Sequence, residues 1–477
     1  MKIDKLSIPN LKQAQLRSRD ETLIQRSIFD IPEHLRNIGE NRFYYLRTYG
    51  CQANERDSET IRGMCEALGY LPVSEVEQAD LIIHNTCAIR ENAEQKVFGE
   101  LGNLRRLKYE NPDLIFVVCG GMAQEEKVVE RILKTYPHID VVFGTDNWHR
   151  FPTLLSQAIF NKERVIEVYS KEGEVYENLP VRRVQKTKAW VNIMYGCDKF
   201  CTYCIVPYTR GKERSRLKED ILEEIDVLVS EGYKEVTLLG QNVNAYGKDL
   251  GIDYDFADLL EDVSLKKIDR VRFMTSHPWD FSDRMIDIMS KENNIMPFLH
   301  LPLQSGDSDI LKIMGRRYSI EDYMNLYRRL KNKMPRLALS TDIIVGFPNE
   351  TEEQFQHTLD VMDEIQFDNA YTFIYSPRFG TPAAQMEDNV PLKVKKERLQ
   401  RLNAKVNQYA LIRSKEMIGQ TVKVLVDGPS KKNPNIYSGY TENNKLVNFT
   451  AQKDVSGLVI NVKIKQANTW TLKGEAL

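Results

Sequence analysis

The residues with the clearest chemistry are three cysteines in one short loop. Cys197, Cys201 and Cys204 form a CxxxCxxC pattern just after an expected β-strand. Three thiolates on one loop can hold a [4Fe–4S] cluster and leave its fourth iron without a protein ligand. That open iron can chelate the amino and carboxylate groups of S-adenosylmethionine. The alternatives are three buried thiols or a structural zinc site. A structural zinc site normally has four protein ligands, and no nearby histidine or cysteine supplies a fourth.

A second group of cysteines follows successive strands of an expected parallel sheet. Cys51 and Cys87 come shortly after the first two strands, and Cys119 comes at the end of the third. The carboxyl ends of parallel strands share one edge of the sheet, so these thiols can converge there. The pattern predicts a second iron–sulfur cluster. Cys65 lies on the apolar stripe of a helix and is expected to be an ordinary core residue.

The composition narrows the class of protein. The chain has 477 residues, 66 Lys plus Arg and 68 Asp plus Glu, which gives a net charge of −2. Any nucleic-acid surface must therefore be a local patch. No segment predicts a membrane span or a signal peptide, so we expect a cytoplasmic protein that makes no membrane contact. Seven cysteines in such a chain favour metal or redox chemistry over a disulfide framework.

The elements that must position these cysteines are predicted to form an α/β multidomain protein. Residues 1–41 are a polar extension without a strand pattern, and residues 42–165 alternate strands with amphipathic helices. Strands are expected at residues 43–47, 81–84, 114–118 and 141–143, in an N-terminal parallel α/β sandwich. The polar residues 166–182 are interpreted as a linker.

Residues 183–412 repeat the alternation of strand and helix. Strands are expected at residues 189–194, 235–239, 270–275, 297–301, 339–345 and 370–374. They are too few for the usual eight-fold barrel and fit a six-fold partial (β/α) barrel. After a long charged helix at 394–417, residues 413–477 predict a small β-barrel with strands at 422–426, 446–449 and 458–464 and a turn at Asp427–Pro429. This tail carries a net charge of +5.

Several motifs together make the chain resemble the radical SAM methylthiotransferases over about residues 43–477. They are Thr48–Asn54, Asn85–Lys96, Tyr195–Tyr208, Thr275–Pro278, His300–Gly306 and Ser340–Pro348, with Tyr437–Thr441 and Val447–Phe449 similar to the family's RNA-binding TRAM domain. The resemblance implies that the central region is a radical SAM barrel and that the tail is a TRAM-like domain.

The resemblance also implies a function with two [4Fe–4S] clusters. One, on Cys197, Cys201 and Cys204, would cleave S-adenosylmethionine to a radical that removes hydrogen from carbon 2 of N(6)-isopentenyladenosine at tRNA position 37. The N-terminal cluster would supply sulfur, and a second S-adenosylmethionine would supply the methyl group. The implied partners are the tRNA anticodon stem-loop, a flavodoxin or ferredoxin-type electron donor, and an external sulfur source.

The chain departs from the family's pattern at one ligand position. The family has Gly-Cys-Met-Ala-Gln where this chain has Gly120–Gly121–Met122–Ala123–Gln124. Gly121 therefore stands where the third auxiliary cysteine is expected. Cys119 lies two residues earlier, roughly 6–7 Å along an extended chain. Either Cys119 substitutes for the missing ligand, or the second cluster is incomplete.

Further residues are candidates to bind S-adenosylmethionine because they follow barrel strands or lie in the cysteine loop. A glycine lets a ligand approach closely, and amide and hydroxyl groups can bind it. These candidates are Tyr203, Gly240, Gln241, Asn242, Ser276, Gln304 and Asp342. A turn, core or structural hydrogen-bonding role is the alternative for each. His277 and His300 are expected to be structural histidines.

Candidate RNA contacts lie in two basic segments. Four of them directly follow the cysteine loop, where cations and Tyr208 suit the phosphates and bases of an RNA loop. The others belong to the basic tail. The candidates are Arg210, Lys212, Arg214, Arg216, Lys431, Lys432 and Lys445. A solvated charged face is the alternative.

Three other functions remain open at the level of sequence. Related enzymes thiomethylate threonylcarbamoyl-adenosine in tRNA, or a ribosomal protein. A third possibility is a tRNA-binding protein that is impaired in sulfur transfer because of Gly121. The segment Arg90–Lys96 and the basic tail favour the isopentenyladenosine substrate.

Overall fold

The computed structural model describes residues 24–88, 91–145, 147–168, 174–430 and 433–477. The chain divides into two compact units. The first comprises the described parts of Met1–Val184 with Met194–Arg216 and Arg378–Pro382, and the second comprises Gln185–Ile193, Leu217–Pro377 and Ala383–Leu477. No helix within the described ranges is both long and apolar enough to cross a membrane.

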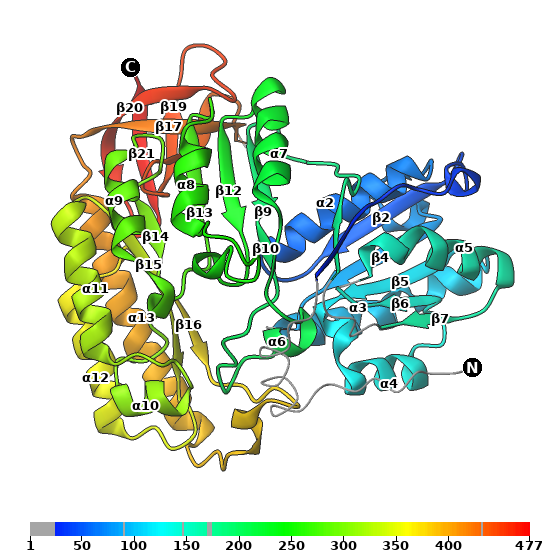
Figure 1. The fold of residues 1–477 in the computed structure, drawn as a ribbon, viewed down its shortest axis with the longest axis horizontal. Helices are drawn as coiled ribbons and strands as arrows, with labels where there is room; N and C mark the ends of the chain where they lie inside the picture. The colour runs from blue at the N-terminus through cyan, green and yellow to red at the C-terminus, as the bar shows by residue number, and fades with distance from the viewer. Residues whose placement is uncertain (1–23, 89–90, 146, 169–173, 431–432) are drawn as a thin grey trace. The chain divides into compact units, whose positions relative to one another are not determined.

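The first unit is built on a parallel sheet with helices on its faces, as the sequence predicts (Figure 1). The central strands β4 and β5 are buried along their whole length, which is why they appear in the sequence as continuous apolar runs. In sheet order the strands are β3 (Leu71–Pro72), β2 (Phe43–Thr48), β4 (Leu81–Thr86), β5 (Ile115–Gly120), β6 (Val141–Phe143) and β7 (Val165–Glu167).

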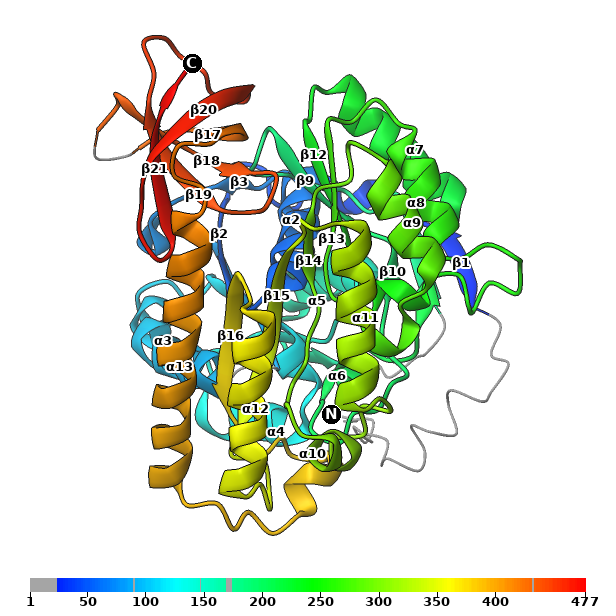
Figure 2. The same ribbon diagram turned by 90° about the vertical axis from the view of Figure 1, so that its left-hand side faces the viewer.

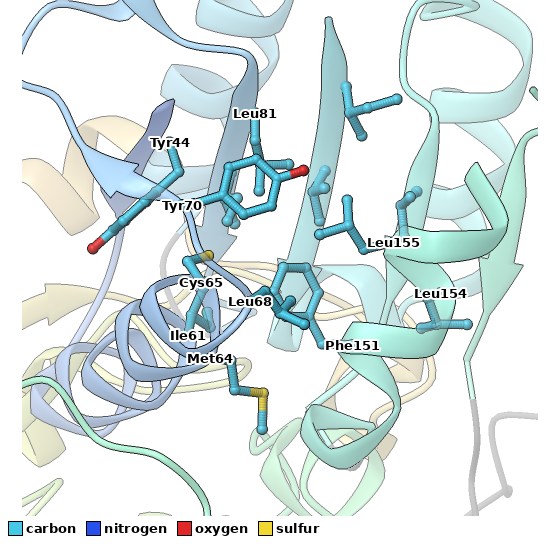
Figure 3. Close-up of a cluster of buried hydrophobic side chains, with 14 of the residues drawn as sticks. Tyr44, Ile61, Met64, Cys65, Leu68, Tyr70, Leu81, Phe151, Leu154 and Leu155 are labelled. Atoms are coloured by element: carbon cyan, nitrogen blue, oxygen red, sulfur yellow. The ribbon is translucent and has the colours of Figure 1, made fainter. Parts of the chain in front are cut away.

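Each face of this sheet packs against helices. The helices are α2 (Gln52–Ala67), α3 (Glu91–Glu110), α4 (Glu126–Thr135) and α5 (Phe151–Asn161). Residues of α2 and α5 form one hydrophobic core, and residues of α3 and α4 form the other. Figure 3 shows the first core, in which Cys65 lies among Ile61, Met64 and Leu68 of the α2 stripe. The prediction that Cys65 is a core residue is confirmed.

Two expectations at the borders of this unit are wrong. The extension contains β1 (Gln25–Ile28) and a turn of 3-10 helix, η1 (Glu33–Leu35), and the expected linker contains β8 (Glu174–Glu177). β1 pairs with β8 in parallel, so two segments far apart in the sequence make one small sheet. The mostly exposed β1 has no alternating apolar pattern, and only the distant partner reveals it. The first 23 residues lie outside the described part of the chain.

The second unit contains the strands of the partial barrel, arranged in chain order (Figure 1). They are β9 (Lys188–Asn192), β12 (Glu235–Leu239), β13 (Arg270–Phe273), β14 (Phe298–His300), β15 (Ala338–Val345) and β16 (Asn369–Ile374). Neighbouring strands are parallel, and a bridge from Val271 to Ile295 joins the β9–β13 half to the segment that precedes β14. The six-fold partial barrel is confirmed.

Helices cover the outside of these strands. They are α7 (Lys218–Ser230), α8 (Phe256–Ser264), α9 (Asp283–Lys291), α10 (Ser308–Ile313), α11 (Ile320–Lys333) and α12 (Glu352–Ile365). Asp255, Ser319 and Thr351 each begin a helix with a reciprocal capping box. Such caps satisfy the first amide groups of a helix and fix where it begins.

The long helix α13 (Leu392–Lys415) leads into a closed β-barrel (Figure 2). Its strands are β17 (Thr421–Pro429), β18 (Ile436–Thr441), β19 (Leu446–Thr450), β20 (Val459–Ala467) and β21 (Thr471–Ala476). The expected turn at Asp427–Pro429 is wrong. These residues continue β17 through a register shift at Gly428, whose φ of 143° suits a β-bulge.

Hydrogen bonds from two buried arginines attach the small barrel to the start of the barrel strands. The Arg270 guanidinium donates to the carbonyl oxygens of Tyr440 and Lys423, at 2.9 and 3.0 Å. Arg272 donates to the carbonyl oxygens of Thr441 and Glu442, both at 2.9 Å. Because each arginine bonds to backbone, the small barrel is fixed to this edge.

Candidate functional site

Two thiols meet at the carboxyl edge of the N-terminal sheet. Cys51 precedes the first residue of α2, and Cys87 directly follows β4. A hydrogen bond from the Cys87 thiol lowers the pKa of Cys51 to about 5, against the opposing effect of burial and with help from the nearby Arg210. A Cβ atom at Gly50 would lie 2.5 Å from the Cys87 Cβ atom, so only glycine fits beside this pair. The structure brings these two predicted ligands together.

Gly121 faces the same edge but supplies no ligand. It begins the short 3-10 helix η3 (Gly121–Gln124), directly after β5. A Cβ atom at position 121 would lie 3.1 Å from the amide nitrogen of Ala88, the residue after Cys87. Position 121 is therefore adjacent to the Cys87 segment, where a third thiol would belong.

Cys119 does not take this place. It is fully buried in the same core as Cys65, and its thiol donates to the carbonyl oxygen of His84 at 3.6 Å. Burial raises the pKa of this thiol well above its ordinary value. The strand continues to Gly120, two residues beyond the expected end, so Cys119 is still paired within the sheet, opposite Asn85 and Phe143. The structure therefore contradicts the idea that Cys119 replaces the missing ligand.

The cysteine loop runs between two short elements, β10 (Met194–Tyr195) and α6 (Val206–Thr209). A turn brings the amide of Cys204 to the carbonyl oxygen of Cys201 at 2.9 Å. Burial raises the pKa of Cys197, and Glu213, Cys204 and Cys201 raise it further. A thiol such as Cys197, whose ionisation is opposed in this way, is one that a bound cation or cluster would stabilise as a thiolate. The loop therefore fits the predicted cluster.

A cluster differs from a single metal ion in what it requires of its ligands. In the described parts of the chain, no three His, Cys, Asp or Glu side chains are arranged to hold one metal ion. A cluster binds its thiolates through separate irons, so its ligands need not meet at one point.

The two cysteine sites belong to the same compact unit. Ala88, which follows Cys87, packs in one apolar cluster with Phe200, Ile205 and Tyr208 of the cysteine loop and α6. Phe200 adopts a left-handed conformation, with φ of 48°, to reach this position. The loop therefore rests on the N-terminal sheet edge, although it follows the first barrel strand in the sequence.

A buried ion pair makes the second connection between the cysteine loop and the N-terminal sheet. Arg210 donates to Asp57 of α2 at 2.7 Å and to the amide oxygen of Asn54 at 3.3 Å. Asp57 and the nearby Cys51 thiolate raise the pKa of Arg210 despite burial. Sequence reasoning missed Asn54 and Asp57. The available signal was their spacing of three, which puts two polar side chains on one buried face of α2.

In the barrel unit, two predicted ligand residues present buried polar atoms that lack partners. Asn242 follows β12, and Ser276 follows β13. Within the described residues, neither the Asn242 Oδ1 atom nor the Ser276 Oγ atom has a hydrogen-bond partner, although both residues are almost fully buried. Asn242 is oriented by its own amide, which donates to Asp280 at 2.7 Å. Buried groups are normally satisfied, so the pair fits a polar ligand such as S-adenosylmethionine.

The later strands place Gln304 and Asp342 beside each other. The backbone amide of Gln304 donates to the backbone carbonyl oxygen of Asp342 at 2.8 Å, and Gln304 has a φ of 70°. The ring of His300 bonds to Ser340 at 2.8 Å and to the Asp342 carboxylate at 3.3 Å. His300 is thus a satisfied structural histidine, as expected. The ring of His277, the other histidine expected to be structural, accepts a hydrogen bond from the backbone amide of Trp279.

The remaining candidate ligands are less sharply placed. Gly240 and Gln241 lie half-buried in the loop after β12. Tyr203 is half-buried in the turn between Cys201 and Cys204. Their contact with S-adenosylmethionine stays a prediction.

The structure gives most of the predicted RNA cations internal partners. Arg210 pairs with Asp57, and Arg216 pairs with Glu177 at 2.7 Å with 7% of its side chain exposed. Arg214 is also buried, whereas Lys212 is half-buried. Because these arginines are enclosed, they do not form the open basic surface that the sequence suggests.

Of the three candidates in the tail, Lys445 lies within the described residues, and it has an internal partner. Lys445 pairs with Asp368 at 3.2 Å and is mostly buried. Lys431 and Lys432 lie outside the described residues. Binding of RNA by all of these cations stays a prediction.

Segments of the chain match known families in the order in which the domains were expected. Residues 43–144 match the Uncharacterized protein family UPF0004, residues 191–362 match the Radical SAM superfamily, and residues 415–477 match the TRAM domain. The cysteine loop and Ser276 fall within the Radical SAM match. Cys51, Cys87 and Gly121 fall within the N-terminal match.

Relatives cover nearly the whole chain. The tRNA-2-methylthio-N(6)-dimethylallyladenosine synthases of Bacillus licheniformis and Bacillus subtilis are each 58% identical to it over 468 residues, or 98% of this chain and 92% of theirs. The protein of the same name from Geobacillus kaustophilus is also 58% identical, with 98% of this chain and 88% of its own length covered.

Solved structures support the fold. The radical S-adenosylmethionine methyltransferase TsrM from Kitasatospora setae, with cobalamin and a [4Fe-4S] cluster bound, aligns with a TM-score of 0.52 and 14% identity over 72% of this chain and 77% of its own. Its complex with tryptophan and a SAM analogue gives a TM-score of 0.51 at 13% identity, and the alignment covers 72% of this chain and 75% of that chain. At such identities the likeness concerns the fold alone.

Proposed function

Because this chain belongs to the radical SAM methylthiotransferases, in the group of tRNA-2-methylthio-N(6)-dimethylallyladenosine synthases, we propose that it methylthiolates carbon 2 of N(6)-isopentenyladenosine at tRNA position 37. The product is 2-methylthio-N(6)-isopentenyladenosine, and the enzyme is a tRNA methylthiotransferase. The observation that carries this proposal is 58% identity along 98% of the chain. Because these relatives carry the name of the dimethylallyladenosine synthase, the identity does not favour the threonylcarbamoyl-adenosine or ribosomal-protein substrates.

The enzyme uses an iron–sulfur cluster and S-adenosylmethionine. Cys197, Cys201 and Cys204 are the residues proposed to hold the cluster, because they lie on a single loop and the Cys204 and Cys201 thiols act on the Cys197 thiol. When bound, the cluster supplies the electron that cleaves S-adenosylmethionine to a deoxyadenosyl radical. Asn242 and Ser276 bind polar groups of S-adenosylmethionine with the buried atoms that lack partners in the described structure. A flavodoxin or ferredoxin is the proposed electron donor.

The N-terminal thiols are the proposed site of the second cluster. Cys51 and Cys87 alone do not fit the three-thiolate arrangement that the family resemblance implies, because Gly121 lacks a side chain and Cys119 is in the core. Loading of this site therefore depends on a ligand from outside the pair. The sulfur source is likewise a separate partner.

The remaining proposals concern the substrate and its location. The C-terminal barrel, with its basic tail sequence, is proposed to bind the tRNA. Since tRNA is the substrate, the cytoplasm is the proposed location. The domain bounds at residues 42–165, 183–412 and 413–477 stay predictions.

Mass spectra of tRNA nucleosides test the function directly. A strain that lacks this protein should lose 2-methylthio-N(6)-isopentenyladenosine and accumulate N(6)-isopentenyladenosine. Complementation with the wild type should restore the modified nucleoside, and Cys201→Ala should not. Cys65→Ala is the matched control, since it removes a core cysteine that lies outside both sites. Undiminished modification in the deletion strain would contradict the proposal.

A further inference from the structure

A cavity in the barrel unit is lined by none of the residues proposed to hold a cluster or S-adenosylmethionine. Its volume is about 360 Å³, and its lining includes Trp279, Phe281, Arg317, Tyr318, Asp322 and Leu326. Pockets that hold small ligands or single groups of larger ones typically begin at about 300 Å³. The cavity is therefore large enough for a nucleotide.

The cavity lies on the carboxyl edge of the barrel strands. Trp279 belongs to a 3-10 helix, η6 (Pro278–Asp280), in the segment that leaves the carboxyl end of β13. Asp322 and Leu326 lie in the first half of α11, which starts at that edge and returns the chain to the amino end of β15. Active sites of such barrels are built at this edge, which also carries Asn242 and Ser276.

Trp279 is both exposed and fixed in place. The residue is 57% exposed, which is unusual for so large an apolar group. Its amide donates to the ring of His277 at 3.2 Å, and the next residue, Asp280, accepts from Asn242 at 2.7 Å and from Lys248 at 2.5 Å. A rigid backbone thus holds a flat aromatic face at the cavity.

Arg317 is presented by a strained and well-anchored turn. Its φ of 57° is uncommon for a residue with a side chain. On one side Arg316 donates to the Pro302 carbonyl oxygen at 3.2 Å, and on the other the Tyr318 hydroxyl donates to the same oxygen at 3.1 Å. Arg317 between them is exposed and has no hydrogen bond or ion pair in the described part of the chain. Such strain is typical of functional positions.

A second polar residue at the cavity, Asp322, provides a hydrogen-bond acceptor beside the Arg317 donor. The Oδ2 atom of Asp322 accepts from the amide and hydroxyl of Ser319, at 2.9 and 2.7 Å. These bonds leave Asp322 Oδ1 available as an acceptor. Arg329 is occupied by an ion pair with Asp283. The cavity therefore combines the exposed aromatic face of Trp279, the Arg317 cation, which is unpaired among the described residues, and an acceptor on Asp322.

This combination suits an unpaired nucleotide. Proteins bind the unstacked bases of RNA loops by stacking them on aromatic side chains, while arginines contact phosphates. We propose that the cavity binds an unpaired nucleotide of the tRNA anticodon loop other than the modified adenosine. Its base stacks on Trp279 and donates to Asp322, and its phosphate contacts Arg317. The inference rests on the proposed function and names a specific part of the substrate's binding site.

The test measures binding of an anticodon stem-loop RNA to reconstituted full-length enzyme by fluorescence anisotropy. Trp279→Ala should raise Kd about 5- to 150-fold, the loss expected for one base–aromatic stack. Trp279→Phe keeps a stacking face and should bind within a few fold of the wild type. Arg317→Ala should reduce the slope of log K against log salt by about one, as for a single phosphate contact. Phe160→Ala, which removes an exposed aromatic residue on α5, is the control and should bind like the wild type.

The possible failures can be told apart. Thermal unfolding and iron content equal to the wild type establish that each variant is folded. If Trp279→Ala binds the RNA as tightly as Phe160→Ala, the cavity is not a nucleotide site, while the proposed function stands. If the wild type itself does not bind the stem-loop, the proposed function fails together with the inference. A salt slope unchanged in Arg317→Ala would overturn the phosphate contact.

Discussion

Replacing Gly121 with cysteine should create a complete second iron–sulfur site. The backbone at 121 is in an ordinary conformation, so the substitution brings no strain in φ. The new Cβ atom would lie 3.1 Å from the Ala88 amide nitrogen and 3.4 Å from the Ala88 Cβ atom, which requires a shift of a few tenths of an ångström. Crowding of this kind costs roughly 1–3 kcal/mol, while the stiffer unfolded chain offsets about 0.4–1 kcal/mol. The variant should therefore fold.

The iron content gives the magnitude of the effect. A complete [4Fe–4S] cluster contributes about four irons per chain. The measurement is clearest in a Cys201→Ala background, in which the radical cluster is absent. There the chain with Gly121 should bind well under four irons after anaerobic reconstitution, and Gly121→Cys should bind about four. With Cys201 intact, the expected values are about four and about eight.

Two controls separate ligation from packing. Gly121→Ser adds a Cβ atom and a hydroxyl group without a thiolate, and it should gain no iron. Cys119→Ala should leave the iron content unchanged, because the Cys119 thiol is in the core and bonds to the His84 carbonyl oxygen. If the Cys201→Ala chain with Gly121 already binds about four irons, other ligands complete the site and our reading of position 121 is wrong.

Three further substitutions test other parts of the structure. Ser276→Ala should leave stability unchanged or raise it by up to about 1 kcal/mol, because it removes a buried hydroxyl without a partner, yet it should weaken S-adenosylmethionine binding about 3- to 10-fold. Calorimetric titration and thermal unfolding check both signs, and tighter binding would contradict the assignment. Arg210→Leu leaves Asp57 buried without its cation and should lower the free energy of unfolding by about 3–5 kcal/mol in urea. A loss of RNA affinity without loss of stability would instead favour an RNA contact. Burial, and then Glu94, raise the pKa of Glu125 from 4.5 to about 7, so its contribution to stability is present below pH 4.5 and is lost as pH rises through 7. Glu125→Gln should remove about 3 kcal/mol of that pH dependence between pH 4 and 8, and equal urea-unfolding profiles for both proteins would refute this.

Local patterns explain how much of the fold the sequence predicts. The strands β4 and β5 are apolar throughout because both faces of the sheet are covered, and α2 shows its core face at Ile61, Met64 and Cys65. The cysteine positions followed from the ends of such strands. Each of these signals lies within one element, so no knowledge of its partners was required.

The misses depend on contacts between distant segments or on the exact end of a strand. β1 is visible only through its pairing with β8, about 150 residues away. The two extra residues of β5 decide that Cys119 packs in the core rather than at the sheet edge. The partners of Arg210 and Arg216 lie on α2 and β8, so a basic segment in the sequence became a set of buried ion pairs.

The placement of the cysteine loop constrains the chemistry more than the number of cysteines does. In the sequence, the first barrel strand lies between Cys87 and the cysteine loop, so domain bounds taken from the sequence place the two in different domains. The structure instead holds both in one unit, through Ala88 against Phe200 and through Arg210 against Asp57. Residues that share a packed cluster or a buried ion pair couple energetically. Loss of a ligand at one thiol site should therefore be felt at the other, which makes Gly121 relevant to both thiol sites.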